Sequence, residues 1–367
     1  MNFLLVSGIY PPDIGGPATY IPRLASHLVA EGHNVSVVSL TDSRLVVRQK
    51  EEWTSSFVLR ESNRIFRTVS LIELIRRKAK DSDLIFANGL YIETALALLG
   101  KKKNSTAKIV GDPVWEKYKN QNKTKLSIDE FSVGRSGFKS WLMRKIYNVA
   151  LNSFDKITAP SKNLALNISN WGVKEPVQVI HNGVVCINPK STKFKYDVVS
   201  VARLVPWKNI DKLIEACSNA KLSLVIVGDG PESDRLKSLA ERKRTNITFL
   251  GQLHEEKVLS VLRESKIFAL ISSYEGLSFA LIEAMMAEKR ILVSLAPGNT
   301  EVITDNVEGL VVDPENISEI TEKLIFLSSN NIESENLGRN ARARSLALYC
   351  EENQLSKMCD LIMKKQV

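Results

Sequence analysis

The sequence predicts an α/β fold built from two Rossmann-like domains, each with a doubly wound parallel sheet. Short apolar runs of strand length alternate along the chain with segments whose apolar residues recur at helical spacing. This alternation stops at a polar segment with an Asn-Gly turn, 181–194, and then starts again. The 367 residues are enough for two domains of ordinary size. We therefore expect an N-terminal domain over 1–185 and a C-terminal domain over 186–349, with a helix at about 350–367 packing back on the first.

The first half opens with a strand, a glycine-rich turn, a helix and a second strand, which together make a βαβ unit. These three elements are expected at 2–8, 18–31 and 34–39. In the turn, Gly15 and Gly16 let backbone N–H groups approach a ligand because no Cβ is in the way. The turn does not complete the GxGxxG fingerprint, so a dinucleotide site of that kind is weakly supported.

The same alternation continues to residue 180 and predicts one doubly wound sheet for this half. Further strands are expected at 83–87, 107–110, 155–158 and 177–180. Further helices are expected at 91–100, 137–151 and 161–170. The segment 117–139 is polar and basic, and we expect it to form a mobile loop and a surface helix rather than core.

The second half repeats the pattern and predicts a second parallel sheet. Its strands are expected at 196–201, 222–227, 247–250, 266–271, 290–294 and 309–312. Its helices are expected at 208–219, 232–243, 255–264, just after residue 277, and from residue 313 to the C-terminus. Arg203 and Lys208 come just after the first of these strands. Because strand C-termini face the ligand crevice in open parallel sheets, these two cations could bind a pyrophosphate, although a solvated surface is the simpler interpretation.

The segment SSYEGLSFALIEAMM, 272–286, carries two carboxylates separated by seven residues. If a helix begins near Leu277 or Ser278, Glu275 precedes its N-terminus and Glu283 lies more than one turn inside it. A helix N-terminus can hold a phosphate, so the two carboxylates suit a ligand with hydroxyls on either side of a phosphate. The alternative is a buried helix with one surface and one capping glutamate.

Composition indicates a soluble globular protein, with 44% hydrophobic and 25% charged residues. No run reaches the ~18–20 apolar residues of a membrane-spanning helix, and the N-terminus lacks the basic flank of a signal peptide. The four cysteines are scattered without metal-ligand spacing, so we expect reduced thiols in a cytosolic protein. They are Cys186, Cys217, Cys350 and Cys359.

The net charge of +9 is unevenly distributed. Residues 1–190 hold 27 Lys and Arg against 16 Asp and Glu, whereas residues 191–367 hold 23 against 25. The basic excess suggests that the first half faces an anionic partner, unless it is a diffuse solvated surface. No motif indicates a nucleic-acid partner.

In their order along the chain, several motifs resemble the GT-B glycosyltransferases of group 1, the retaining GT4 class. The motifs are Gly15-Gly16, HNGV, VARLVPWKN, VGDGPE, FLGQL, SSYEGLSFALIEAMM and PGNTEVI. The resemblance covers nearly the whole chain and is strongest over 197–313. It implies two domains that face each other across a cleft, the first binding the acceptor and the second the nucleotide-sugar donor.

The resemblance also implies a role for each matching residue. Arg203 and Lys208 would neutralise the donor diphosphate, Glu283 would bind the ribose hydroxyls, and Glu275 would contact the transferred sugar. The remaining substrate-binding positions act through backbone or crevice contacts. They are Gly276, Leu277, Ser278 and Phe279 for the phosphate, Gly251–Leu253 for the base, and Gly15 and Gly16 for the phosphate and acceptor crevice.

The chain departs from the family pattern in four places, one of which is Ser278 in place of a common Gly, a small-for-small change that we expect to be tolerated. Asp112 stands where many relatives carry a catalytic histidine, so it inherits the position as a catalytic candidate. After the glutamate helix, Ala287-Glu288-Lys289-Arg290 replaces the usual Gly-x-Pro, and Val185 replaces a common Asp after HNGV. None of these changes removes a charged contact.

The implied reaction is retaining transfer of a hexosyl group from a UDP- or GDP-sugar without a metal or other cofactor, because Arg and Lys neutralise the leaving diphosphate. Competing hypotheses are a nucleotide-sugar epimerase of the same fold, a nucleotide-binding protein without transferase activity, and a dinucleotide oxidoreductase. The oxidoreductase is disfavoured because the first unit lacks both GxGxxG and a ribose-binding acid.

The helix expected at 137–151 predicts peripheral membrane association. Phe138, Trp141, Leu142, Ile146 and Val149 recur at helical spacing beside Lys139, Arg144 and Lys145. Ordinary packing on the sheet would explain the helix alone, but lysines at 101–103 and 117–125 favour an anionic surface for the domain. We therefore expect a cytoplasmic protein at the inner leaflet, acting on a lipid-linked or surface glycan acceptor.

Overall fold

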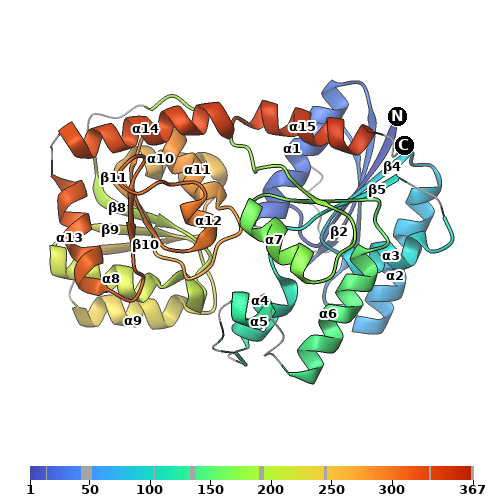
Figure 1. The fold of residues 1–367 in the computed structure, drawn as a ribbon, viewed down its shortest axis with the longest axis horizontal. Helices are drawn as coiled ribbons and strands as arrows, with labels where there is room; N and C mark the ends of the chain where they lie inside the picture. The colour runs from blue at the N-terminus through green and yellow to red at the C-terminus, as the bar shows by residue number, and fades with distance from the viewer. Residues whose placement is uncertain are drawn as a thin grey trace. The chain divides into compact units, whose positions relative to one another are not determined.

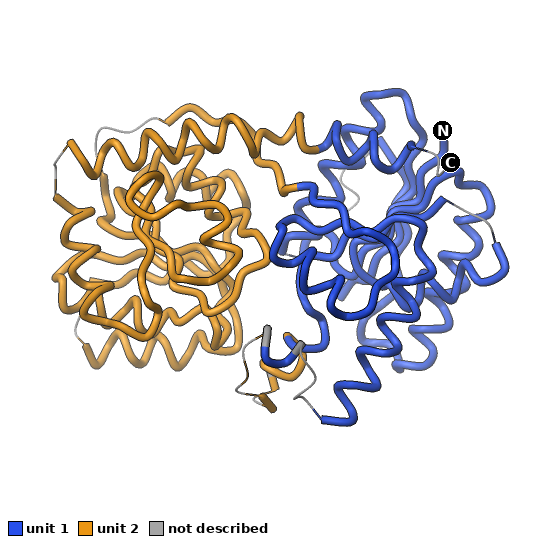
Figure 2. The backbone as a smooth tube through the Cα atoms, in the orientation of Figure 1, with its two compact units in different colours: residues 1–115, 129–180, 355–367 blue, residues 116–128, 181–354 orange. Residues whose placement is uncertain are grey.

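The computed structural model describes residues 1–13, 15–42, 52–101, 104–121, 123–124, 126, 128–132, 137–189, 194–243, 246–329 and 332–364. The chain forms two compact units (Figure 2). Unit 1 comprises residues 1–115, 129–180 and 355–367, and unit 2 comprises 116–128 and 181–354. Each unit contains one parallel sheet covered by helices, which confirms the predicted fold class (Figure 1).

Unit 1 is built on a seven-stranded parallel sheet in the order β3-β2-β1-β4-β5-β6-β7. Its strands are β1 (Asn2–Ser7), β2 (Asn34–Thr41), β3 (Thr54–Leu59), β4 (Leu84–Asn88), β5 (Asn104–Lys108), β6 (Lys156–Ala159) and β7 (Val177–Val179). The helices of the chain up to residue 180 are α1 (Gly16–Ala30), α2 (Arg64–Lys80), α3 (Tyr91–Leu98), α4 (Pro113–Asn120), α5 (Ile128–Ser132), α6 (Phe138–Leu151) and α7 (Lys162–Asn170).

Strand β1 is the centre of this sheet because it pairs with β2 on one side and β4 on the other. Leu5 lies between Val37 and Phe86 in the register, and residues Phe3 to Val6 are buried. A strand that is covered on both faces needs a continuous apolar run, which is what the sequence supplies. The strand order reverses between β1 and β4, so the crevice at their C-terminal ends is the expected ligand position.

Two elements of unit 1 were not predicted, and one was displaced. Strand β3 is half-polar and lies at the sheet edge, and α2 buries only Leu71, Ile75 and Ala79, so neither has a strong apolar pattern. Strand β5 occupies Asn104–Lys108 rather than 107–110. The start of this polar strand is fixed by Asp155, whose Oδ2 accepts from Ser105 N–H at 2.8 Å. The two residues are far apart in the chain, so the sequence pattern does not show this contact.

Unit 2 is built on a six-stranded parallel sheet in the order β10-β9-β8-β11-β12-β13. Its strands are β8 (Tyr196–Val201), β9 (Leu224–Val227), β10 (Ile247–Gly251), β11 (Ser265–Leu270), β12 (Arg290–Ser294) and β13 (Leu310–Val312). The helices after residue 181 are the 3₁₀ turn η1 (Pro206–Lys208), α8 (Ile210–Ala220), α9 (Ser233–Lys243), α10 (Glu255–Arg263), α11 (Phe279–Met286), α12 (Pro297–Thr300), α13 (Ile317–Ser328), α14 (Ile332–Leu348) and α15 (Glu351–Met363).

Alternate residues of the unit 2 strands form two cores, one on each face of the sheet. Val199 and Phe268 pack into the core covered by α10, α11 and α14. Val198 and Ile267 pack into the core covered by α8, α9 and α13. The period-two alternation therefore buries both faces, as doubly wound sheets require.

The expectation of four free thiols is wrong for two cysteines. Cys186 and Cys350 form a disulfide, whereas Cys217 and Cys359 are free and buried. An isolated parallel β-bridge between the backbones of Val184 and Cys350 brings the two segments together. The Cα atoms of Cys186 and Cys350 are therefore only 6.1 Å apart. This pairing depends on contacts across the fold, and the spacing of cysteines in the sequence does not reveal it.

Among the described residues, no helix combines the length and apolar character needed to cross a bilayer. At the C-terminus, residues 355–364 belong to unit 1. There Lys156 Nζ donates to the carbonyl oxygens of Leu361 at 2.8 Å and Ile362 at 3.2 Å. These bonds satisfy carbonyl groups at the end of α15 that have no partner within the helix.

The turn after α11 shows how this chain ends the helix without the usual Gly-x-Pro. Glu288, which stands at the glycine position, has φ +54°, a left-handed conformation that non-glycine residues adopt at a cost. Arg290, at the proline position, donates to the carbonyl oxygens of Leu327 and Ser329, both at 2.6 Å. Arg290 thus satisfies the end of α13, while Glu288 retains the strain.

We predict that Glu288→Gly stabilises the protein. Glycine relieves a conformational cost of about 1–2 kcal/mol and returns about 0.5–1 kcal/mol as extra entropy of the unfolded chain. The net gain should raise the Tm by about 1–4 °C in thermal unfolding. Glu288→Ala is the matched control, since it removes the carboxylate but keeps a Cβ; an equal rise for both variants would mean that φ is not the cause.

Candidate functional site

The candidate site of unit 2 lies where β8 ends. After Val201 the chain passes through Arg203 into η1, which ends at Lys208. The structure therefore places both predicted cations at the C-terminal edge of the sheet, beside the strand where the order of strands reverses. The Arg203 side chain is exposed and makes no ion pair or hydrogen bond with the described part of the chain.

Lys208 and Glu275 form the central ion pair of this site. Lys208 Nζ donates to Glu275 Oε1, which also accepts from Ser272 Oγ at 2.6 Å. The Lys208 side chain is 14% exposed and that of Glu275 9%, so both charges are largely withdrawn from water. The sequence did not predict this pairing, although it identified both residues.

A turn at Asn209 fixes the segment that carries Glu275 to the segment that carries Lys208. Asn209 is left-handed, with φ +49°, and its side-chain amide donates to Ile271 O at 2.8 Å and to Ser273 Oγ at 2.9 Å. Ser273 N–H in turn donates to Trp207 O at 2.7 Å. The geometry of the ion pair is therefore set by backbone contacts and not by the two flexible side chains alone.

A buried polar network also holds the segment that carries Glu275. Ser294 Oγ, at the end of β12, donates to Ser272 O at 2.5 Å. Asn299 is fully buried and donates from Nδ2 to Ser294 Oγ at 3.2 Å. In the same turn, a Cβ added to Gly298 would come within 2.2 Å of Glu275 O, so only glycine allows α12 to approach the loop this closely.

Helix α11 begins directly after this loop. Ser278 is its N-cap, and its Oγ accepts from Leu281 N–H at 3.3 Å. Gly276 and Leu277 are buried, and Leu277 O accepts from the buried Asn182 Nδ2 at 3.1 Å. As predicted, Glu275 precedes the helix and Glu283 lies at its fifth residue, where it is half-buried.

The loop that ends β10 lies beside the loop that ends β9. Gly251 has φ +64°, and its carbonyl oxygen accepts from Gly228 N–H at 2.8 Å. A Cβ on Gly228 would meet Ala202 O at 1.9 Å. Leu253 is half-buried against the core. Close backbone packing thus links the predicted base-binding loop, 251–253, to the segment just before Arg203.

The predicted glycines of unit 1 lie at the start of α1. Gly15 is the N-cap and Gly16 the first residue of the helix, and a Cβ on Gly15 would come within 2.8 Å of Ile9 Cδ1. At the end of the neighbouring strand β4, a Cβ on Gly89 would meet Gly8 N at 2.9 Å. The C-terminal ends of β1 and β4 are therefore lined by backbone, as the turn motif predicts.

Asp112 is held by contacts that favour a structural role over a catalytic one. It is 1% exposed, and its Oδ1 accepts from the N–H groups of Val114 and Trp115, both at 3.0 Å, as a helix cap for α4. Its Oδ2 accepts from Arg144 Nη2 at 2.7 Å. A carboxylate engaged through both oxygens has little capacity left to take an acceptor proton.

Comparison with known proteins identifies the family. The sequence profile described as glycosyl transferases group 1 matches residues 188–344, and that of glycosyltransferase family 4 matches residues 14–186. The chain belongs to the group 1, family 4 glycosyltransferases. An uncharacterized glycosyltransferase of Methanocaldococcus jannaschii is 25% identical, with 93% of each chain covered.

Two further relatives carry more specific descriptions. The poly(ribitol-phosphate) alpha-N-acetylglucosaminyltransferase of Staphylococcus aureus is 25% identical over 57% of this glycosyltransferase and 44% of its own length. The structure of HepE from Anabaena, solved in complex with UDP and glucose, superposes with a TM-score of 0.80 at 17% identity, covering 98% of this chain and 99% of that one. The GT-B fold is thereby confirmed.

Several residues that build this site were missed by the sequence analysis. They are Asn182, Asn209, Ser272, Ser294, Gly298 and Asn299. All of them except Ser294 stand in motifs that were recognised, namely HNGV, VARLVPWKN, SSYEGLSFALIEAMM and PGNTEVI. The motifs gave these positions without the contacts, and the partners of Asn182 and Asn209 lie far away in the chain.

Proposed function

We propose that this glycosyltransferase transfers a hexosyl group, with retention, from a UDP- or GDP-sugar to a lipid-linked or surface glycan acceptor. In this proposal residues 1–185 bind the acceptor and residues 186–349 bind the donor. The observation that carries the proposal is the fixed Lys208–Glu275 pair between the exposed Arg203 and the N-terminus of α11.

The electrostatics of this arrangement suit a diphosphate. Arg203 provides a free guanidinium that can form two parallel hydrogen bonds to phosphate oxygens. The N-terminus of α11 provides unpaired N–H groups and the positive end of the helix dipole. Glu275 holds Lys208 in position, so the ammonium group is already oriented when charge develops on the leaving diphosphate.

The two carboxylates divide the recognition of the rest of the donor. Glu275 lies at the loop before α11, where it would contact the transferred sugar, and Glu283 lies one turn into the helix, where it would accept hydrogen bonds from the ribose hydroxyls. Retention without a protein nucleophile requires attack on the same face of the sugar, with the leaving phosphate taking the acceptor proton. Asp112 then contributes by holding α4 and Arg144 in place.

The proposed reaction needs no metal, because cationic side chains neutralise the diphosphate. The two carboxylates of Asp81-Ser82-Asp83 could in principle hold a metal, but they stand at the other edge of the unit 1 sheet, before β4. Asp83 Oδ2 accepts from Asn2 N–H at 2.8 Å there. This position is remote from the C-terminal ends of the strands, so we assign the pair no role in transfer.

An exposed apolar stripe on α6 supports membrane association. All five predicted apolar residues are between 45% and 74% exposed: Phe138, Trp141, Leu142, Ile146 and Val149. The rings of Phe138 and Trp141 stack at 5.8 Å, and Lys145 Nζ lies 5.8 Å from the Trp141 ring. The stripe is therefore not explained by packing on the sheet, which uses Ala150 and Leu151 instead.

Helix α2, which the sequence analysis missed, carries further exposed apolar residues. Ile65, Phe66 and Val69 are 56–77% exposed on α2, and α3 packs between α2 and α6 (Figure 1). Arg64 and Arg77 are also exposed on α2. We propose that α2 and α6 together hold unit 1 at the cytoplasmic leaflet, where a lipid-linked acceptor is within reach. The predicted Lys102, Lys103, Lys125 and Arg135 lie outside the described residues.

We predict that Arg203→Ala and Lys208→Ala each lower kcat by on the order of 10²–10³, because each removes stabilisation of a charge that grows in the transition state. Glu283→Ala should chiefly raise the KM for donor, since ribose contacts change little during the reaction. Transfer is measured with the nucleotide sugar that gives the largest rise in Tm. Wild-type rates for Arg203→Ala would overturn the site assignment, and nucleotide-sugar interconversion without acceptor would favour an epimerase.

We predict that transfer is independent of divalent metals. After treatment with EDTA, the initial rate of transfer at a temperature well below the Tm should equal that of untreated enzyme, because Arg203 and Lys208 supply the charge that Mg²⁺ or Mn²⁺ would supply elsewhere. A rate that falls with EDTA and returns only with Mn²⁺ or Mg²⁺ would show that the diphosphate is neutralised by a metal.

We predict salt-sensitive binding to anionic vesicles. Each Lys or Arg near an anionic leaflet contributes about 1 kcal/mol, and the apolar stripe adds burial in the interface. In flotation, Phe138→Ser should lower recovery with phosphatidylglycerol vesicles, while Ile332→Ser, an exposed apolar residue of unit 2, should not. Equal recovery with neutral and anionic vesicles, or binding unchanged at high salt, would contradict the electrostatic part of the mechanism.

A further inference from the structure

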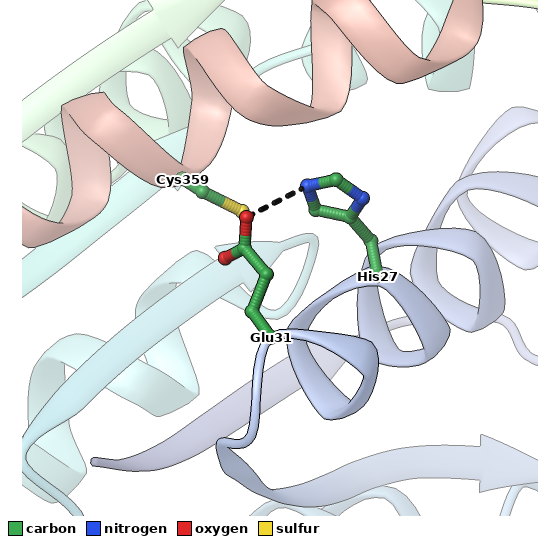
Figure 3. Close-up of side chains that lie close together, drawn as sticks. All are labelled: His27, Glu31 and Cys359. Atoms are coloured by element: carbon green, nitrogen blue, oxygen red, sulfur yellow. Dashed lines mark ion pairs between the residues drawn. The ribbon is translucent and has the colours of Figure 1, made fainter.

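The C-terminal end of α1 and the helix α15 bring together four side chains of types that bind metals. His27 lies in the last turn of α1, Glu31 is the C-cap of that helix, and Cys359 lies on α15 (Figure 3). His33 follows Glu31 by two residues. The donor atoms of His27, Glu31 and Cys359 all lie within 4.8 Å of one another. Their side chains converge on one point between the two helices, as the close-up shows.

The spacing of these atoms fits ligands of one metal better than hydrogen bonds. His27 Nε2 and Glu31 Oε1 are 3.3 Å apart, which is ion-pair distance, while the buried His27 Nε2 makes no hydrogen bond (Figure 3). Two ligand atoms on one tetrahedral zinc ion, at bond lengths of about 2.0–2.3 Å, lie about 3.3–3.6 Å from each other. A hydrogen bond between nitrogen and oxygen would instead be about 2.9 Å long.

His33 lies on the other side of Glu31, beside the three residues whose ligand atoms are close together. His33 Nε2 is 3.9 Å from Glu31 Oε2, and its ring packs against Phe3 of β1 at a centroid distance of 5.2 Å. The imidazole is thus oriented by the sheet, while its nitrogen faces the carboxylate. Both histidine side chains are less than 20% exposed, and Cys359 is 1% exposed, so three of the four donors are largely shielded from water.

We propose that His27, Glu31 and Cys359 bind a zinc ion that fastens α15 to the end of α1, and that the His33 ring turns toward the ion to become its fourth ligand. Two imidazoles, a thiolate and a carboxylate form a donor set that suits Zn²⁺ and not Mg²⁺ or Ca²⁺, which prefer oxygen ligands. On binding, the sulfur–zinc bond replaces the sulfur–hydrogen bond of Cys359, and the proton passes to solvent. Burial, with the charges of Glu31 and Asp360, raises the pKa of this thiol to about 12, so it stays protonated until a cation arrives.

The site is structural and separate from the proposed transfer chemistry. It lies at the C-terminal end of α1, whereas Gly15 and Gly16 lie at the N-terminal end, about 20 Å away for a helix of this length. Zinc would join residues near the two ends of the chain within unit 1. Removal of the metal should therefore lower the stability of unit 1 and leave the rate of transfer unchanged at low temperature.

The test is zinc binding by the full chain in a buffer without thiols, measured by competition with a chromophoric chelator and by thermal unfolding. Wild type should bind one Zn²⁺, and zinc at 100-fold over its Kd should raise the Tm by about 5 °C or more. Cys359→Ser and His27→Gln should lose most of this zinc-dependent rise and bind at least tenfold more weakly. Cys217→Ser, the matched control at the other free buried cysteine, should behave as wild type.

Co²⁺ gives a second readout that does not depend on the stability of the variants. Cobalt bound to wild type should show a thiolate-to-cobalt charge-transfer band in the near ultraviolet, and His27→Gln should weaken the binding without removing the band. Failure of wild type to bind one zinc ion, equal zinc shifts in Cys359→Ser and wild type, or a cobalt complex without the thiolate band would each overturn the proposal. Loss of transfer in Arg203→Ala bears on the proposed function alone.

Discussion

A buried ion pair imposes conditions on everything around it. Withdrawing Lys208 and Glu275 from water costs several kcal/mol for each charge, and mutual attraction compensates only when further hydrogen bonds complete the arrangement. Ser272 supplies one such bond, and Asn209 and Ser294 hold the backbone that positions Glu275. Much of the polar structure at this edge of the sheet therefore follows from the burial of two opposite charges as a pair.

This constraint also explains where glycine is required. The loop before α11 is approached from one side by α12, and Gly298 permits that approach because its hydrogen atom takes the place of a Cβ that would contact Glu275 O. Gly228 likewise permits a close approach to the end of β8, because a Cβ there would meet Ala202 O. The close backbone packing that glycine allows restricts the segments that carry Lys208 and Glu275, and so limits the freedom of these two long side chains.

The sequence predicted the residues of the site better than their contacts. Arg203, Lys208, Glu275 and Glu283 are found by local signals, namely strand ends, helix starts and a fixed spacing. The bonds of Asn182 and Asn209 span 95 and 62 residues, and no local pattern carries them. The same holds for Asp112, which looks catalytic by position, while its surroundings, Arg144 and the α4 N-terminus, make it a cap. Helix α2 was missed because the stripe it buries, Leu71, Ile75 and Ala79, is narrow and stands among many charged residues, so its apolar pattern is weak.

The junction of the two units has a consequence for how such chains can be rebuilt. Apart from residues 116–128, unit 2 is one insertion into unit 1, because the chain leaves unit 1 after residue 180 and returns to it at 355. Within unit 2 both ends start from one place: Val184 N–H donates to Tyr349 O at 2.9 Å, and Glu351 N–H donates to Val184 O at 3.0 Å. The segment between residues 180 and 355 can thus be exchanged as one piece without a new linker, because its two ends lie side by side. Chimeras that combine this unit 1 with the unit 2 of a relative would test directly which unit selects the donor.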